Sequence, residues 1–260
     1  MQDPSSWLSS RDQIAPDWRD RIFVFWLGPA ELSETRLEGL RTLTTSECRI
    51  HLVTEQTLAS FVLPGRPFHA AFAFLSPIHQ SDYLRAYFMH HFGGGYTDIK
   101  RCHASWKPAF EAIEREEALG AGYGEVPGGT ARFHKSKIAG QRYFLDRPAG
   151  ALEMAWRYRR TKRLRAYVIG NGAFIFRPDT ELTGRWLSIV EKRLDILLPH
   201  LKANPARYPK EVPGVDYGDG PSRYPVPWSF LLGDVLAPLT LEYHRRILQL
   251  VPAPDFENYE

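Results

Sequence analysis

Short apolar runs alternate with amphipathic stretches along the first quarter of the chain. Residues 21–28 are apolar at their centre, which is typical of a buried strand, and Gly28 ends them in a turn. Leucines at helical spacing predict a helix over residues 31–44. Residues 48–54 predict a second strand, followed by a short helix near 56–63. This strand-helix-strand order favours two parallel strands of one sheet, whose ligands bind beyond the carboxyl ends of the strands.

Residues 81–100 predict a capped helix, a glycine turn and a short strand. Ser81 is a candidate N-cap, and Asp82 follows in the first turn, where a carboxylate suits the positive end of the helix dipole. The glycines at 93–95 stop the helix, because glycine adopts left-handed backbone angles at little steric cost. Residues 96–99 have strand composition, so we expect Asp98 where a strand meets a loop.

The rest of the chain continues this alternation. Residues 106–119 predict a helix capped by Ser105. Five glycines in residues 120–129 predict an irregular loop, which lacks the Gly-Lys-Ser/Thr of a phosphate-binding P-loop. Farther on, the pattern predicts a helix over 149–165, a strand over 167–177 interrupted by Gly-Asn-Gly, a helix from Asp179 as cap to about 202, a loop over 204–224 and a last helix through Tyr243 and Arg246. The order indicates an α/β fold with a mixed central sheet flanked by helices.

Composition is that of an ordinary globular chain. Of its 260 residues, 43% are apolar and 24% are charged, and the length suffices for one large α/β domain. We expect a single domain over 1–260, with an N-terminal extension at 1–20 and a C-terminal loop and helix at 204–260 that close the site. The net charge of +3, without a zinc-finger or RNA-binding pattern, argues against a nucleic-acid partner.

Cysteine usage and hydropathy favour a cytoplasmic setting. The two cysteines, Cys48 and Cys102, form neither a disulfide framework nor a metal-ligand pattern. Residues 1–20 lack the apolar core of a signal peptide, and the longest apolar run, 22–27, is too short to cross a bilayer.

Four side chains of the 81–100 segment form a candidate ligand site. Asp82 and Arg85 are three residues apart and therefore share a helix face, and Tyr96 and Asp98 follow the tight turn. Carboxylates accept hydrogen bonds from hydroxyl groups, and arginine binds oxyanions in a fork, so the set suits a sugar joined to a phosphate. The alternative is a core helix with an Asp-Arg pair, a glycine cap and a buried tyrosine.

The same segment resembles the SDxxRxxxLxxxGGxYxDxD core of glycosyltransferases with a DxD sugar-binding region, such as family 32 and capsular polysaccharide transferases. The matching residues are Ser81, Asp82, Arg85, Gly93 or Gly94, Tyr96 and Asp98. The resemblance implies a GT-A type, Rossmann-like fold that binds a UDP- or GDP-sugar. It also implies transfer of the sugar to a glycan or lipid-linked acceptor, with retained anomeric configuration, in bacterial or viral capsule, lipopolysaccharide or related glycan synthesis.

One position departs from that core. The second aspartate of DxD, which in the family ligates Mn²⁺ or Mg²⁺, is Lys100 here, and a charged lysine has no lone pair for a metal. Three interpretations follow: Lys100 neutralises the diphosphate without a metal, sugar-nucleotide chemistry is lost, or Asp234 supplies a metal ligand together with Asp98. We favour the first, because Lys100 puts positive charge where a leaving diphosphate develops negative charge.

By the same resemblance, further residues take roles at the donor. Asp82 and Arg85 would bind the sugar hydroxyls, Tyr96 and Asp98 would hold the ribose and sugar, and Asp98, Lys100 and Arg85 would be catalytic. The remaining candidates for donor contact are Trp26, Gly28, Asn171, Trp228, Ser229 and Asp234. The alternatives are core packing for Trp26 and Trp228, a β-bulge at Asn171 and a helix cap for Asp234.

A run of basic residues favours a second kind of partner. Residues 157–165 hold six cations among nine residues, which could bind the enzyme to an anionic inner membrane face at about 1 kcal/mol per cation. The alternative is an exposed helix end whose cations match the helix dipole. Two rival functions therefore stand beside a transferase: an inactive sugar-nucleotide-binding relative, and a basic module that binds membranes or polyanions.

Overall fold

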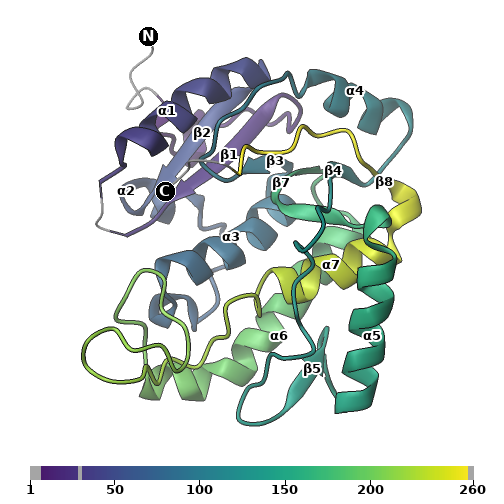
Figure 1. Cartoon of the computed structure of the whole chain (residues 1–260). Helices are drawn as coiled ribbons and strands as arrows, with labels where there is room; N and C mark the ends of the chain where they lie inside the picture. The colour runs from purple at the N-terminus through teal and green to yellow at the C-terminus, as the bar shows by residue number, and fades with distance from the viewer. Residues whose placement is uncertain (1–6, 29–30, 257–260) are drawn as a thin grey trace.

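A mixed six-stranded sheet with helices on both faces forms the centre of the molecule (Figure 1). The structure, a computed structural model, describes residues 7–28 and 31–256. The strands are β1 Arg21–Trp26, β2 Arg49–Thr54, β3 Gly94–Thr97, β4 Gly120–Gly124, β5 Arg142–Phe144, β6 Arg147–Ala149, β7 Ile169–Phe176 and β8 Ile247–Leu248. The helices are α1 Glu34–Thr42, α2 Glu55–Leu58, α3 Pro77–His91, α4 Lys107–Arg115, α5 Ala151–Arg163, α6 Glu181–Ala203 and α7 Gly233–Glu242. The predicted α/β class with a mixed, helix-flanked sheet is confirmed.

The strand order is β2-β1-β3-β7-β4-β8, and β5 and β6 form a separate two-stranded sheet. β1 pairs in parallel with β2 and with β3, which confirms the predicted parallel opening unit. β7 runs antiparallel to both of its neighbours, β3 and β4, and β4 is parallel to β8. The carboxyl ends of β1, β2 and β3 therefore meet at one edge of the sheet.

Alternating side chains of the strands divide the core into two layers, because successive residues of a strand point to opposite faces. Phe23 and Phe25 of β1 pack with α3, α6 and α7 on one face, whereas Ile22 and Val24 pack with α1 and α4 on the other. Strand β1, which the sequence predicts as a continuous apolar run, is therefore buried on both faces. Figure 1 shows α1 and α4 above the sheet and α3, α6 and α7 below it.

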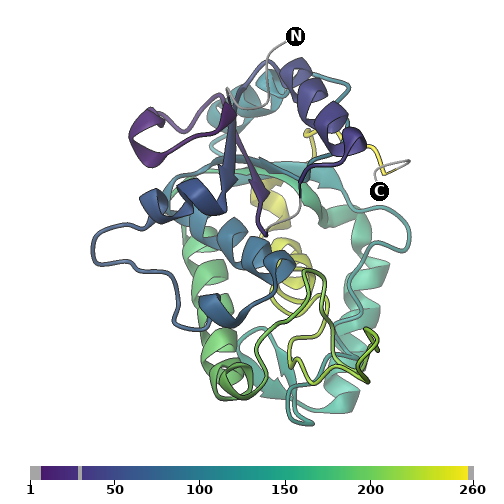
Figure 2. The ribbon, with the colours of Figure 1, turned by 90° about the vertical axis from the view of Figure 1, so that its left-hand side faces the viewer.

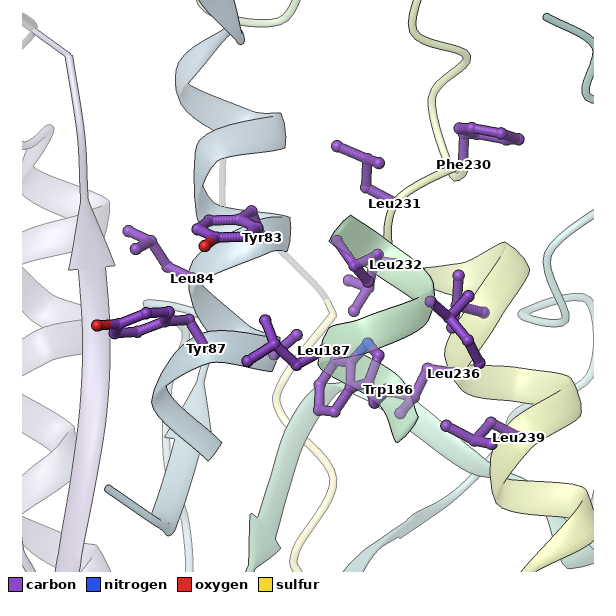
Figure 3. Close-up of a cluster of buried hydrophobic side chains, with 14 of the residues drawn as sticks. Tyr83, Leu84, Tyr87, Trp186, Leu187, Phe230, Leu231, Leu232, Leu236 and Leu239 are labelled. Atoms are coloured by element: carbon purple, nitrogen blue, oxygen red, sulfur yellow. The ribbon is translucent and has the colours of Figure 1, made fainter. Parts of the chain in front are cut away.

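Helix α3 lies in the middle of the lower layer and is buried on nearly all sides. Figure 3 shows Trp186 and Leu187 of α6 between the tyrosines of α3, Tyr83 and Tyr87, and the leucines of α7. The predicted start at Ser81 is wrong, because the helix begins at Pro77 with Ser76 as N-cap. Proline suits a first helical position, where its missing N–H has no partner to lose. Asp82 consequently lies in the second turn, away from the end of the helix.

The glycine turn after α3 is confirmed, and it has a partner that the sequence did not indicate. Gly93 has φ +65°, and a Cβ there would lie 2.4 Å from Pro178 Cδ, so only glycine fits. The buried side chain of Arg21 donates hydrogen bonds to the carbonyl oxygens of Phe92 and Gly93 at the end of the helix. These bonds satisfy backbone acceptors that a helix end leaves open.

The predicted loop over 120–129 is wrong at its start, because residues 120–124 are strand β4 between β7 and β8. Glycine is required here by close packing: a Cβ at Gly120 would lie 2.3 Å from the carbonyl oxygen of Ile175, and one at Gly122 would lie 2.7 Å from Ile169 Cβ. Glycine density therefore marks a close approach between strands here.

Two further boundaries differ from prediction. The strand over 167–177 is continuous as β7, although its register with β4 shifts between Gly122 and Gly124, opposite Gly-Asn-Gly. The cap of α6 is Thr180, whose hydroxyl accepts a hydrogen bond from the N–H of Thr183, and Asp179 has φ +52° before it. In α4, Trp106 is the N-cap position, while the hydroxyl of Ser105 accepts from the N–H of Lys107.

The irregular segment after α6 is confirmed as a long loop. Its buried Glu211 accepts hydrogen bonds from the backbone N–H groups of Arg207 and Tyr208 and from the hydroxyl of Ser222, which ties the two ends of the loop together. Figure 2 shows this loop on the same side of the molecule as the end of β1. Among the described residues, no helix combines the length and apolar character needed to cross a bilayer.

Candidate functional site

A cavity of about 470 Å³ opens beyond the carboxyl ends of β1 and β3. The chain leaves β1 toward β2 on one side and later returns to β3 on the other, so this edge is the point where the strand order reverses. Open α/β sheets bind ligands at such a point. Its walls come from the ends of β1 and β3, the start of α3 and the loop after α6, and they include Trp26, Gly28, Arg36, Arg85, Tyr96, Asp98, Lys100, Lys210 and Trp228.

Asp98 is the acidic group of the cavity, and three neighbours fix its position. Its N–H donates to the carbonyl of Gly172 on β7 at 2.8 Å. Its Oδ1 accepts from the hydroxyl of Tyr96 at 2.8 Å and from Arg85 Nη2 at 3.2 Å. The side chain is 27% exposed, so a carboxylate held on one oxygen still faces the cavity with the other.

Arg85 connects the residues beneath Asp98. Its Nη1 donates to the carbonyl of Asn171 at 3.0 Å, and its guanidinium lies 4.3 Å from the centre of the Tyr96 ring. Burial alone would lower the pKa of Arg85, but the phenol of Tyr96 and the carboxylates of Asp98 and Asp82 outweigh it and raise that pKa. Arg85 is therefore charged, and each of its terminal nitrogens donates one hydrogen bond within the protein.

Lys100 stands on the other side of Asp98, with Nζ 3.8 Å from Asp98 Oδ2 and 4.1 Å from the centre of the Phe256 ring. The side chain is 6% exposed and lines the cavity. Burial lowers the pKa of Lys100, and the charge of Asp98 opposes that shift. A buried amine thus lies beside the Asp98 carboxylate.

Asp82 lies behind this group, and it is absent from the cavity walls formed by the described residues. Its Oδ1 is 3.9 Å from Arg85 Nη2. Burial raises the pKa of Asp82 from 3.8 to about 7, with Arg85 opposing and Asp98 adding to the shift. The residue that we expected to bind sugar hydroxyls directly is placed to act on Arg85.

The raised pKa of Asp82 predicts a pH-dependent stability. The folded protein binds the proton of the Asp82 carboxyl more tightly than the unfolded chain does. The stabilisation from this proton is therefore fully present below about pH 4 and is lost as the pH rises through about 7. Urea titrations of Asp82→Asn and of the original protein measure the difference between their free energies of unfolding. We expect this difference to change in favour of Asp82→Asn from pH 5 to pH 8, because only the original protein loses the proton. A difference between the two proteins that stays constant over this range would contradict the pKa shift.

Two tryptophans stand at the cavity. Trp26 ends β1, and Trp228 comes from the loop after α6 with 54% of its surface exposed. A tryptophan this exposed contributes little to the core, which argues against the packing-anchor interpretation of Trp228. Gly28 has φ +97°, and its N–H donates to Glu55 Oε1 at 2.9 Å, which holds the turn after β1.

Sequence reasoning missed two cations of the cavity, Arg36 and Lys210. Arg36 lies on α1 and donates to the carbonyl of Ile99 at 2.7 Å, next to Lys100. Lys210 lies in the loop after α6. Nothing in the local pattern distinguishes either residue from an ordinary surface cation, because the fold alone brings these elements to the cavity.

Asn171 and Asp234 lie outside the cavity walls. Asn171 contributes its carbonyl to Arg85, and its side-chain nitrogen lies near Gly233. Asp234 is buried in the first turn of α7 and accepts a hydrogen bond from the hydroxyl of Ser229 at 2.6 Å. The N-cap of that helix is Leu232, so Asp234 is not the cap.

The residues at Asp98 fit a metal ion poorly. One carboxylate oxygen is held by Arg85 and Tyr96, and the other faces the amine of Lys100, which repels a cation. In the part of the chain that the structure describes, no three His, Cys, Asp or Glu side chains gather as a metal-binding group. The independence from metal stays a prediction.

Comparison with protein-family models, with curated proteins and with solved structures found no match to this chain.

Proposed function

We propose that this protein is a glycosyltransferase that moves a sugar from a nucleotide diphosphate donor to a hydroxyl group of a glycan or glycolipid. The observation that carries the proposal is Asp98, a partly exposed carboxylate held by Arg85 and Tyr96 in a cavity at the sheet's reversal point. The sheet, with its single antiparallel strand β7 among the described strands, is compatible with a Rossmann-like donor domain such as GT-A.

Each part of such a donor has a complementary group in the cavity. The rings of Trp26 and Trp228 offer faces for a base or ribose, and Lys100, Arg36 and Lys210 offer positive charge for a diphosphate. The Asp98 carboxylate accepts hydrogen bonds from sugar hydroxyls. Arg85 donates to the carbonyl of Asn171 and to Asp98, and its role in the proposal is to position the Asp98 carboxylate.

The transfer itself replaces one bond to the anomeric carbon by another. The bond from that carbon to the diphosphate oxygen breaks, and its electron pair stays on the diphosphate. The acceptor hydroxyl oxygen forms the new bond on the same face, and its proton passes to an oxygen of the leaving diphosphate. Lys100 stabilises the charge that develops there, in place of the cation that a DxD site would hold.

A thermal-shift screen of UDP- and GDP-sugars, with and without Mn²⁺, tests this proposal. We expect one donor to raise the melting temperature without Mn²⁺, and to release nucleotide diphosphate with an acceptor present. We expect Trp228→Ala to weaken donor affinity about tenfold, since an exposed ring that stacks on a base contributes 1–3 kcal/mol. Trp156→Ala is the matched control, because Trp156 is similarly exposed and lies on α5.

Two outcomes contradict the proposal in different ways. If no donor shifts the melting temperature and none is turned over, the cavity does not bind nucleotide sugars. If activity is abolished by a chelator and restored by Mn²⁺, the role given to Lys100 is wrong.

The replacement of the second carboxylate by Lys100 favours one alternative, a sugar-nucleotide-binding protein without transfer activity. Donor affinity without release of nucleotide diphosphate, over a panel of glycan and lipid acceptors, would favour it over the transferase.

A further inference from the structure

Helix α5 presents an outward face that combines exposed apolar side chains with a run of cations. Leu152 is 89% exposed and Trp156 is 58% exposed, so two large apolar side chains lie at the surface of one helix. They are four residues apart, and Arg159 and Arg163 continue the same face at helical spacing. Figure 1 shows α5 at the edge of the molecule, with no other element outside it.

The opposite face of α5 anchors the helix to the rest of the fold. Met154 and Thr161, two turns apart, are buried. The ring of Tyr158 stacks on His134 at 4.1 Å, and the guanidinium of Arg157 lies 4.1 Å from the centre of the Phe144 ring. The orientation of α5 is therefore set by packing, so its outer side chains are presented on a fixed support.

The cations of this surface are not neutralised by neighbouring acids. Five of them are exposed: Arg159, Arg160, Lys162, Arg163 and Arg165. Within the described residues, none of the five lies within 4.0 Å of a carboxylate, whereas Arg157 pairs with Glu153 at 3.1 Å. The apolar residues occupy the first turns of the helix and the cations its last turn and the residues after it.

We propose that this face, the α5 surface, binds an anionic phospholipid bilayer. Cations near an anionic membrane gain electrostatic attraction. A tryptophan beside a leucine inserts at the level of the headgroups, where the indole ring contacts apolar chains and its N–H contacts water. A purely polyanionic partner such as nucleic acid accounts for the cations but gives no use to the exposed Leu152. Membrane binding by the α5 surface is therefore separate from donor binding in the cavity and does not depend on it.

Cosedimentation of the full chain with vesicles tests this inference. We expect binding to phosphatidylcholine vesicles that contain phosphatidylglycerol, weakened by added NaCl, and no binding to phosphatidylcholine alone. Charge reversal by Arg159→Glu, Arg160→Glu and Arg163→Glu together should weaken binding by about 100-fold or more. Leu152→Ala with Trp156→Ala should weaken it about tenfold, because apolar burial adds to the attraction.

Matched controls separate the surface from net charge. Lys107→Glu, Arg115→Glu and Lys202→Glu change the net charge equally but lie on α4 and α6. We expect these variants to bind nearly as well as the original protein, and circular dichroism to show that every variant is folded. Equal loss in both triple variants would overturn the inference.

Two further results would also overturn it. One is the absence of vesicle binding at low salt. The other is binding to heparin or RNA that Arg159→Glu, Arg160→Glu and Arg163→Glu abolish, without vesicle binding by the original protein, which would assign the surface to a polyanion. Donor affinity is measured separately with Trp228→Ala, so failure of the membrane proposal and failure of the transferase proposal give different results.

Discussion

Asp98→Asn is expected to lower the rate of nucleotide diphosphate release by about 100-fold to 1,000-fold, the range seen when one positioned electrostatic group is removed from an active site. The substitution keeps the shape of the side chain and keeps an oxygen for the bonds from Tyr96 and Arg85. It removes the negative charge that faces the cavity and replaces an acceptor by a donor. The measurement is the turnover rate with the donor that the thermal-shift screen selects.

The control for this experiment is Asp195→Asn. Asp195 lies on α6, is 70% exposed and pairs with His69, so the variant loses a carboxylate that is not part of the cavity walls. We expect its turnover to match that of the original protein. If Asp98→Asn is folded, binds the donor and turns it over at an unchanged rate, then Asp98 has no part in the reaction and the proposed mechanism is wrong.

Arg85→Met is expected to lower the free energy of unfolding by about 3–5 kcal/mol, the cost of removing one partner from a buried ion pair. Arg85 is buried between Asp82 and Asp98, and its loss also leaves the carbonyl of Asn171 without its donor. Urea titration at pH 8 measures the change. Activity should be lost as well, because the carboxylate of Asp98 would keep only the hydrogen bond from Tyr96.

A double variant separates the ion pair from simple loss of volume. Adding Asp82→Asn to Arg85→Met removes a carboxyl that Arg85 no longer compensates, so we expect the double variant to be more stable than Arg85→Met alone. Arg115→Met, at an exposed arginine of α4, should change the stability by about 0.5 kcal/mol or less. An equally small change for Arg85→Met would contradict the central role given to this residue.

Prediction from sequence succeeded where neighbours along the chain decide the structure. The strands β1 and β2, the helix α5 and the turn at Gly93 follow from local apolar periodicity and from the backbone freedom of glycine. The grouping of Arg85, Tyr96 and Asp98 is also local, because one tight turn joins the helix to the strand.

Prediction from sequence failed where a segment distant along the chain decides the local structure. Residues 120–124 have the composition of a loop, yet they form a strand between β7 and β8. Glycine is needed at 120 and 122 because Ile175 and Ile169 approach these two positions too closely for a Cβ. Helix α3 begins at Pro77 and not at the predicted Ser81, although a proline directly after a capping serine is a signal that the sequence contains. The sequence predicts Arg21 only as the first residue of a buried strand, but its side chain donates to the end of a helix more than seventy residues away.

The sequence alone determined the class of fold, the segment that carries the candidate chemistry and the departure at Lys100, since these depend on residue types and short spacings. Only the tertiary structure decided that Asp82 is buried behind Arg85 while Asp98 faces a cavity, that Trp26 and Trp228 stand at that cavity, and that Leu152 and Trp156 are exposed. Burial and direction are set by segments far apart along the chain that pack against one another, and no local pattern encodes which segments those are.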